Sequence, residues 1–290
     1  MIAKPGIVDS RADTYLVLQG ETVARNDVEA IAKLTGAARI DCSAPNVFKL
    51  LNAKPHADLQ AMSANFRLDF AFVPAALKLS YFKLVAMDMD STLINIESLD
   101  EVADFAGLKQ EIAAITEQSM NGKVDFTESL RRRVSMLKGL DASALERVYE
   151  DRVELNPGAE KLMATLKAQG IKTMLVSGGF TFFTERLKQR LGLDFAFANE
   201  LEIVDGKLTG AIIGPVLDPA AKAAKIREVS DVFGIFQAGR VIAIGDGAND
   251  RPMFEVVGTG VGYRPKAVLR PHARYCLDFV GLDGVANLFS

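Results

Sequence analysis

Three short apolar runs, each followed by small or polar residues, constrain the fold of this chain more than any other feature. They occupy residues 84–87, 173–176 and 241–244. Such runs are typical of strands that are buried on both faces of a parallel sheet. Ligands of open α/β sheets bind outside the carboxyl ends of the strands, so the residues after the three runs are expected to meet. The pattern therefore predicts an α/β fold with a ligand site at one edge of a mainly parallel sheet.

The first run ends in two carboxylates, Asp88 and Asp90, followed by the hydroxyl of Thr92. A buried strand that presents two carboxylates at its end can supply a nucleophile, an acid/base and a ligand for a hard metal ion. Two like charges in such a place also need a cation or a proton to relieve them. These residues are therefore a candidate phosphoryl-transfer centre. A strand followed by an ordinary Asp-Ser-Thr turn is the alternative.

The other two runs end in residues that suit the same chemistry. Asp246, Asn249 and Asp250 follow the third run on a tight, glycine-containing loop. Ser177 and Gly178 follow the second run and offer a hydroxyl and flexible backbone amides, which are suited to phosphate oxygens. Because three strands end in related chemistry, a phosphoryl-transfer site is favoured over a simple turn.

In chain order, Asp88 to Thr92, Ser177 to Gly179, Lys222 and Gly245 to Asp250 resemble the four motifs of the haloacid dehalogenase-like hydrolase superfamily. Within it, the resemblance is strongest to members that hydrolyse O-phospho-L-serine. It implies a Rossmann-like parallel-sheet core with a helical cap inserted after the first catalytic strand. It also implies hydrolysis of O-phospho-L-serine through an aspartyl-phosphate intermediate, the last step of L-serine biosynthesis.

The resemblance assigns roles to the carboxylates. It implies that Asp88 is the nucleophile and that Asp90 is the general acid/base. It implies a Mg²⁺ cofactor held by Asp88, Asp246 and the backbone carbonyl of Asp90. Thr92 and Asp250 are expected to support this metal site without binding the ion directly.

The resemblance also assigns the phosphate-binding groups. Lys222 is expected to neutralise the charge shared by Asp88 and the transferring phosphate, although Lys225 lies three residues on and is a rival. Ser177, Gly178 and Asn249 are expected to bind phosphate oxygens.

Residues 95–152 have helical spacing of apolar positions almost throughout, which predicts a helical cap. The resemblance implies that Glu97 binds the substrate ammonium and Arg133 its carboxylate, while Phe126 and Met120 close over the substrate. The alternative is that Glu97 only caps a helix and Arg133 belongs to an exposed basic face.

Residues 1–80 are predicted to form a separate small α+β domain, with the phosphatase-like domain in residues 81–290. Strand patterns lie at Tyr15–Leu18 and Phe66–Phe72, and helical spacing covers Asn26–Leu34. The resemblance suggests a domain of the ACT type, with two helices on a four-stranded sheet. A purely structural or dimerising module, as in a possible homodimer, is an equal alternative.

The composition limits the kinds of partner that this chain is expected to bind. The net charge of −3 and the pI of about 5.6 give no basic footprint for nucleic acid or for a membrane surface. No apolar run approaches the ~18 residues of a membrane helix, and no signal-peptide pattern is present. With only two cysteines, Cys42 and Cys276, a reduced cytoplasmic protein is expected.

Two other functions stay open at this level. One keeps the chemistry and changes the reaction to hydrolysis of another small phosphomonoester, or to phosphoryl transfer onto an alcohol. The other is a ligand-sensing regulator with a vestigial phosphatase core. The presence of Asp88, Asp90 and Asp246 speaks against the second.

Overall fold

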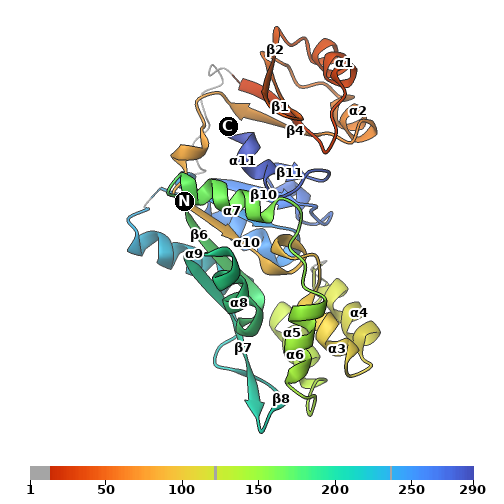
Figure 1. Ribbon diagram of the computed structural model, residues 1–290, viewed down its shortest axis with the longest axis vertical. Helices are drawn as coiled ribbons and strands as arrows, with labels where there is room; N and C mark the ends of the chain where they lie inside the picture. Colours follow the sequence, from red (N-terminus) through yellow and green to blue (C-terminus); the bar gives the residue numbers. More distant parts are fainter. Residues whose placement is uncertain (1–13, 121–122, 236) are drawn as a thin grey trace.

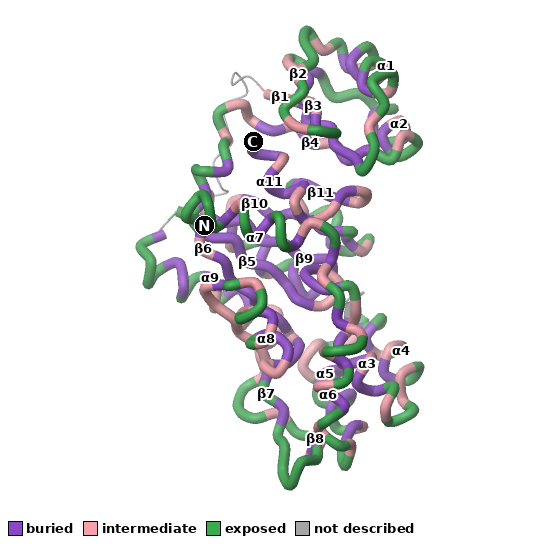
Figure 2. The backbone as a smooth tube through the Cα atoms, in the orientation of Figure 1, coloured by how far each residue is buried: buried purple, intermediate pink, exposed green. Residues whose placement is uncertain are grey.

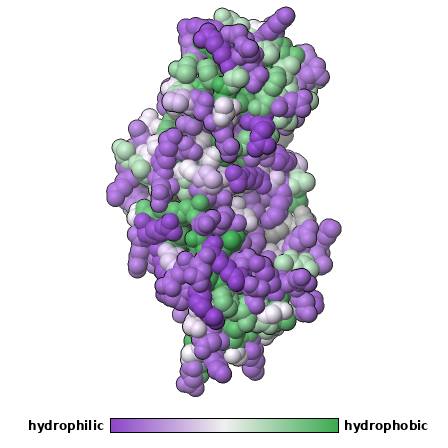
Figure 3. Space-filling view, turned by 45° about the vertical axis from the view of Figure 1, so that its right-hand side comes forward, coloured by the Kyte–Doolittle hydropathy of each residue, from purple (hydrophilic) through white to green (hydrophobic). Residues whose placement is uncertain are grey.

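The computed structural model describes residues 14–290 except 121–122 and 236, and it omits the side chain of Met120. Figure 1 shows three tiers: a small domain formed by the first strands and helices, a central α/β layer, and a group of helices with a long hairpin at the far end. On the face seen in Figure 3, hydrophilic residues surround smaller groups of hydrophobic ones. Among the described helices, none combines the length and the apolar character needed to cross a membrane.

The central sheet has seven strands in the order β11-β10-β9-β5-β6-β7-β8. All neighbouring pairs are parallel except β7 with β8. The strands are β5 (Leu84–Met87), β6 (Lys172–Phe180), β7 (Phe195–Val204), β8 (Lys207–Ile213), β9 (Val241–Gly245), β10 (Thr259–Tyr263) and β11 (Tyr275–Leu277). The predicted α/β fold with a mainly parallel sheet is confirmed.

The three apolar runs form the middle of this sheet. β5 lies between β9 and β6, and all of its residues are buried, as the purple strands of Figure 2 show. Alternate residues face opposite sides, so Val85 and Met87 belong to one apolar cluster and Leu84 and Ala86 to another. Helices cover both faces, which explains why the runs are apolar at consecutive positions.

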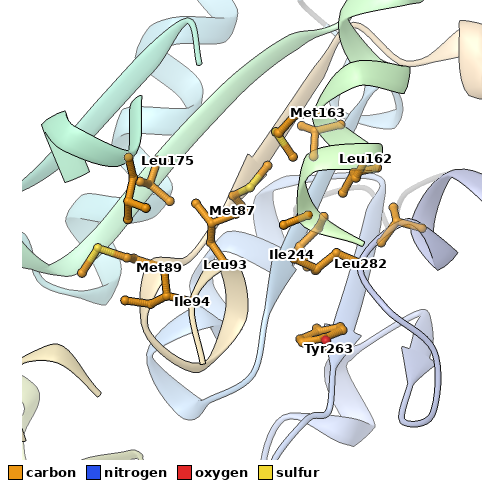
Figure 4. Close-up of a cluster of buried hydrophobic side chains, with 14 of the residues drawn as sticks. Met87, Met89, Leu93, Ile94, Leu162, Met163, Leu175, Ile244, Tyr263 and Leu282 are labelled. Carbon is orange, nitrogen blue, oxygen red and sulfur yellow. The ribbon is translucent and has the colours of Figure 1, made fainter. Parts of the chain in front are cut away.

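The first cluster packs against α7 (Ala159–Ala168), α8 (Thr181–Leu191) and α11 (Gly284–Leu288), and the second against α9 (Pro219–Val232) and α10 (Arg251–Val256). Figure 4 shows part of the first cluster, in which Met87 and Ile244 of the sheet lie with Leu162 of α7 and Leu93 of the loop after β5. The site-bearing loop is thus anchored in the main core.

In the described part of the segment expected to form the cap lie four helices: α3 (Ser98–Asp104), α4 (Lys109–Met120), α5 (Phe126–Ser135) and α6 (Ser143–Asp151). The hairpin of β7 and β8 turns at Asp205 and Gly206, both with positive φ, as the Asp-Gly pair predicts. Its second strand is tied to the cap because the amide of Gly139 donates to the carbonyl of Leu208, and the amide of Leu208 to that of Leu140.

The N-terminal domain has the order β1 (Thr14–Gln19), α1 (Arg25–Thr35), β2 (Arg39–Ala44), β3 (Val47–Leu51), α2 (Leu59–Asn65) and β4 (Asp69–Pro74). Its antiparallel sheet has the order β2-β3-β1-β4, which is the ferredoxin-like arrangement and agrees with the predicted ACT-like fold. The two helices and four strands implied by the resemblance are present, but sequence patterns did not locate β2, β3 or α2. The predicted last strand also began at Phe66, whereas Arg67 turns the chain with φ 54° before β4 begins.

The N-terminal domain docks on the last residues of the chain through buried polar contacts. The carboxylate of Asp69 accepts hydrogen bonds from the amides of Asp278, Phe279 and Val280, at 2.7, 3.0 and 3.0 Å. Gln19 donates to the carbonyl of Gly284 at 3.2 Å. Asp69 is almost fully buried, and burial raises its pKa. One carboxylate therefore carries much of the polar contact between the domains.

We expect Asp69→Ala to lower the free energy of unfolding by about 2–3 kcal/mol, because three amides lose a charged acceptor. Asp69→Asn keeps one acceptor oxygen and should lose less. Asp41→Ala, on the solvent side of β2, is the control and should leave stability unchanged, since its partner is the exposed Arg39. Urea denaturation measures the free energy of unfolding of all three variants. Equal stability of Asp69→Ala and Asp41→Ala would show that the docking does not depend on Asp69.

Candidate active site

The carboxyl ends of β5, β6 and β9 bring the predicted residues together. Met87 pairs with Ile244 on one side and with Leu175 on the other, so Asp88, Asp246 and Ser177 extend from the same edge of the sheet. All three are buried. The sheet order places β5 in the middle, which makes Asp88 the central group of the site.

The loop after β5 is held in an unusual turn. The carboxylate of Asp88 accepts a hydrogen bond from the amide of Met89 at 2.7 Å, and Ser91 has φ 56°. The side chain of Asn156 donates to the carbonyls of Thr92 at 2.8 Å and Ile94 at 2.9 Å. Buried bonds of this kind satisfy backbone groups that no helix or strand pairs. They fix the direction in which Asp88 and the following residues point.

Asp88 lies in contact with a buried lysine. Lys222 is fully buried, and its Nζ lies 2.7 Å from Asp88 Oδ2 and 3.0 Å from Asp250 Oδ1. Asn249 donates to Asp88 Oδ2 at 2.9 Å. Burial by itself would raise the pKa of Asp88, but the charge and hydrogen bond of Lys222 outweigh it and leave this pKa below its ordinary value. The rival Lys225 lies at the surface, paired with Glu228.

Asp90 has a different environment. Its carboxylate accepts hydrogen bonds from the amide and the hydroxyl of Ser98, both at 3.1 Å. Burial, and then the negative charge of Asp88, raise its pKa to about 7. Two neighbouring carboxylates thus differ in proton affinity. That difference suits one ionised nucleophile and one acid that can give up a proton.

Carboxylate oxygens of Asp88, Asp246 and Asp250 lie within 4.8 Å of one another. Asp250 is fully engaged by Lys222 and by the amides of Asp246 and Gly247, at 3.0 and 3.1 Å. The Oδ1 atom of Asn249 is buried and has no hydrogen-bond partner among the described residues. Hard oxygen donors with surplus negative charge and an unpaired acceptor fit a divalent cation between Asp88 and Asp246.

The contacts of Asp246 involve the cap side of the site as well. Asp246 accepts from Thr92 Oγ1 at 3.2 Å and from Lys266 Nζ at 2.9 Å. Lys266 Nζ also lies 3.8 Å from Glu97. Glu97 accepts from the Ser91 hydroxyl at 2.7 Å, and burial together with the charges of Asp90 and Asp246 raises its pKa well above the ordinary value.

A small cavity separates the sheet edge from the cap, with a volume of about 20 Å³. One buried water needs roughly 10–15 Å³, so little free space is left between the cap and the sheet edge. The cavity is lined by most of the residues predicted from the sequence: Asp88, Asp90, Glu97, Phe126, Arg133, Ser177, Gly178 and Asn249. Met120 ends α4, but its side chain lies outside what the structure describes.

Three residues with clear contacts in the site were missed from the sequence: Lys266, Ser98 and Asn156. Lys266 follows β10, so the rule that strand ends carry the site could have identified it. No sequence pattern indicated that Ser98 or Asn156 belongs to the site. Their functions depend on tertiary contacts with Asp90 and with the loop after β5.

Comparison with known proteins agrees with this geometry. The family model for haloacid dehalogenase-like hydrolase matches residues 85–255, and a domain of unknown function, DUF4072, matches residues 16–59. A phosphoserine phosphatase of Albidiferax ferrireducens is 46% identical over 218 residues, which cover 73% of this chain and 92% of the relative. The chain belongs to the haloacid dehalogenase-like hydrolases. The resemblance seen in its motifs is confirmed.

One solved structure extends the likeness to nearly all of the chain, and a second matches about three quarters of it. A probable phosphoserine phosphatase from Vibrio cholerae has a TM-score of 0.81 and 34% identity, covering 96% of this chain and 86% of that one. A substrate-bound phosphoserine phosphatase complex has a TM-score of 0.69 and 38% identity, covering 72% of this chain and 99% of that one. The first match includes the N-terminal domain in the shared fold.

Close contact between cap and core leads to a steric prediction. A Cβ atom at residue 178 would overlap the ring of Phe126, at the start of α5. We expect Gly178→Ala to lower phosphatase activity (kcat/KM) by about tenfold to a hundredfold, because the cap cannot close. The melting temperature should change little. Gly239→Ala is the control, since its Cβ would meet only Tyr81 Oη, at 3.3 Å. Full activity of Gly178→Ala would show that closure does not require this contact.

Proposed function

We propose that the chain hydrolyses O-phospho-L-serine to L-serine and phosphate with the help of Mg²⁺. The observation that carries this proposal is the charge pattern around one narrow cavity. Asp88 and Lys222 lie on the sheet side, and Glu97 and the buried Arg133 lie toward the cap. Phosphoserine carries a phosphate, an ammonium and a carboxylate, and this pattern offers a partner to each.

In the proposed reaction Asp88 attacks phosphorus, forming a carboxylate–phosphorus bond as the bond from phosphorus to the serine oxygen breaks. Asp90 gives its proton to the leaving serine oxygen. It then takes a proton from the water that attacks the aspartyl-phosphate, which releases phosphate and restores Asp88. The raised pKa of Asp90 supports this order of roles.

Lys222 neutralises negative charge on Asp88 and the phosphate, while Ser177, the amide of Gly178 and Asn249 hold phosphate oxygens. Asp88, Asp246 and the carbonyl of Asp90 would hold Mg²⁺, which requires oxygen ligands in an octahedral arrangement. When bound, the ion would polarise the phosphate and offset its charge. Thr92 supports this site through Asp246, and Asp250 supports it through Lys222.

At the other end of the cavity, Glu97 would pair with the substrate ammonium and Arg133 with its carboxylate. Phe126 and Met120 would cover the bound substrate and exclude water. Since this cavity is far smaller than the substrate, the cap would move away from the sheet edge when substrate binds. With L-serine as product, the proposed reaction is the last step of serine biosynthesis.

Three other expectations stay predictions. They are the domain limits at residues 1–80 and 81–290, a cytoplasmic location and a homodimer.

Phosphate release from a small panel of substrates tests the proposal. We expect kcat/KM for O-phosphoserine to exceed that for phosphoethanolamine, which lacks the carboxylate, and for phosphoglycolate, which lacks the ammonium, by at least about tenfold. Chelation of divalent ions should abolish release, and added Mg²⁺ should restore it. If phosphoserine is turned over no better than the other two, the roles of Glu97 and Arg133 are wrong.

Asp88→Asn should abolish both turnover and the phosphoenzyme, because an amide is too weak a nucleophile to attack phosphorus. Rapid acid quenching with ³²P-labelled substrate, followed by peptide mapping, measures the intermediate. Asp205→Asn, in the exposed turn between β7 and β8, is the control and should keep full activity, since Asn also tolerates a positive φ. Label on any side chain other than Asp88 would contradict the assigned nucleophile.

A further inference from the structure

Arg133 has a buried positive charge without a direct ion pair. It is 5% exposed, and among the described residues no carboxylate lies within 4.0 Å of its guanidinium nitrogens. Its Nε donates to the carbonyl of Ser129 at 3.3 Å, and its Nη1 donates to Thr116 Oγ1 at 2.9 Å. Burying a charge in this way is costly unless a nearby group compensates it.

The compensating negative charge is that of Asp100, which is linked to Arg133 through the hydroxyl of Thr116. Thr116 Oγ1 is 2.6 Å from Asp100 Oδ1 and 3.1 Å from the carbonyl of Ile112. A hydroxyl has one proton, and the shorter distance to a carboxylate assigns it to Asp100. The resulting chain runs from the guanidinium through the hydroxyl to the carboxylate. It connects α5, α4 and α3, because Arg133, Thr116 and Asp100 each come from a different cap helix.

We propose that Asp100 and Thr116 are positioning residues that hold Arg133 ready for the substrate carboxylate and so determine specificity for it. This inference rests on the proposed function. The physical reason is the number of guanidinium N–H donors that stay available for the substrate. A guanidinium has five N–H groups, and a direct pair with Asp100 would occupy the fork that a substrate carboxylate needs. With Thr116 in between, Asp100 supplies negative charge while using one donor only.

The electrostatics of the cap interior agree with this arrangement. Burial lowers the pKa of Arg133, and among the charges that oppose this effect Asp100 is the strongest, ahead of Glu97 and Asp90. Asp100 is itself 7% exposed. The alternative is that Thr116 serves only its own helix through the carbonyl of Ile112, a common local bond that would have no effect on substrate choice.

Thr116→Val tests the proposal, because valine keeps the shape and removes the hydroxyl. We expect KM for O-phosphoserine to rise about tenfold, equivalent to about 1.4 kcal/mol, with kcat within about twofold. KM for phosphoethanolamine should stay the same. Thr116→Ser should restore the KM of the unaltered enzyme. Thr165→Val is the matched control: among the described residues its hydroxyl donates only to the carbonyl of Lys161, on the exposed face of α7, so no parameter should change.

Two further variants separate the possible failures. Arg133→Ala should remove the preference for phosphoserine over phosphoethanolamine. If it does not, the proposed carboxylate site fails, and this inference fails with it. If Arg133→Ala removes the preference but Thr116→Val affects both substrates equally, only the positioning role is overturned. Asp100→Asn should reproduce the selective rise in KM, and an equal change for both substrates would overturn the role of Asp100 even if Thr116→Val does not fold.

Discussion

The site depends on a surplus of buried negative charge. Carboxylates extend into the site from two strand ends and from the cap side, and they outnumber the lysines that contact them. The acids are Asp88, Asp90, Glu97, Asp246 and Asp250, and the lysines are Lys222 and Lys266. Such a group is stable only when further cations or protons join it. A divalent ion and a substrate ammonium would supply the missing positive charge, so this surplus of negative charge favours their binding.

The parallel sheet makes this concentration of charge possible. With β5 between β9 and β6, three loops distant in sequence end at one edge, and rigid strands hold their polar ends in place. The cap lies beyond that edge, whereas the N-terminal domain packs at the other end of the core, on the residues around Asp278 and Gly284 (Figure 1). Chemistry and domain docking therefore use separate surfaces of one core.

The cap closes the site with charged groups of its own. Arg133 reaches the cavity from α5 and is compensated from α3 through α4, so the arrangement of three helices decides how its guanidinium is presented. Helices that move together can open the cavity without separating Arg133 from Thr116 and Asp100. This would allow substrate entry while the recognition group stays ordered.

The sequence by itself determined the α/β class, the three buried strands and the candidate residues at their ends, because burial on both faces leaves an unmistakable apolar run. It did not locate β2, β3 or α2, because β2 has few apolar residues, β3 and α2 are only five and seven residues long, and the turn at Asn46 carries no glycine. The motif resemblance favoured Lys222 over Lys225, and the tertiary structure decided between them by burying Lys222 beside Asp88. Only the tertiary structure brought Lys266, Ser98 and Asn156 to the site. Those assignments depend on distances between residues far apart in the chain, which local patterns do not encode.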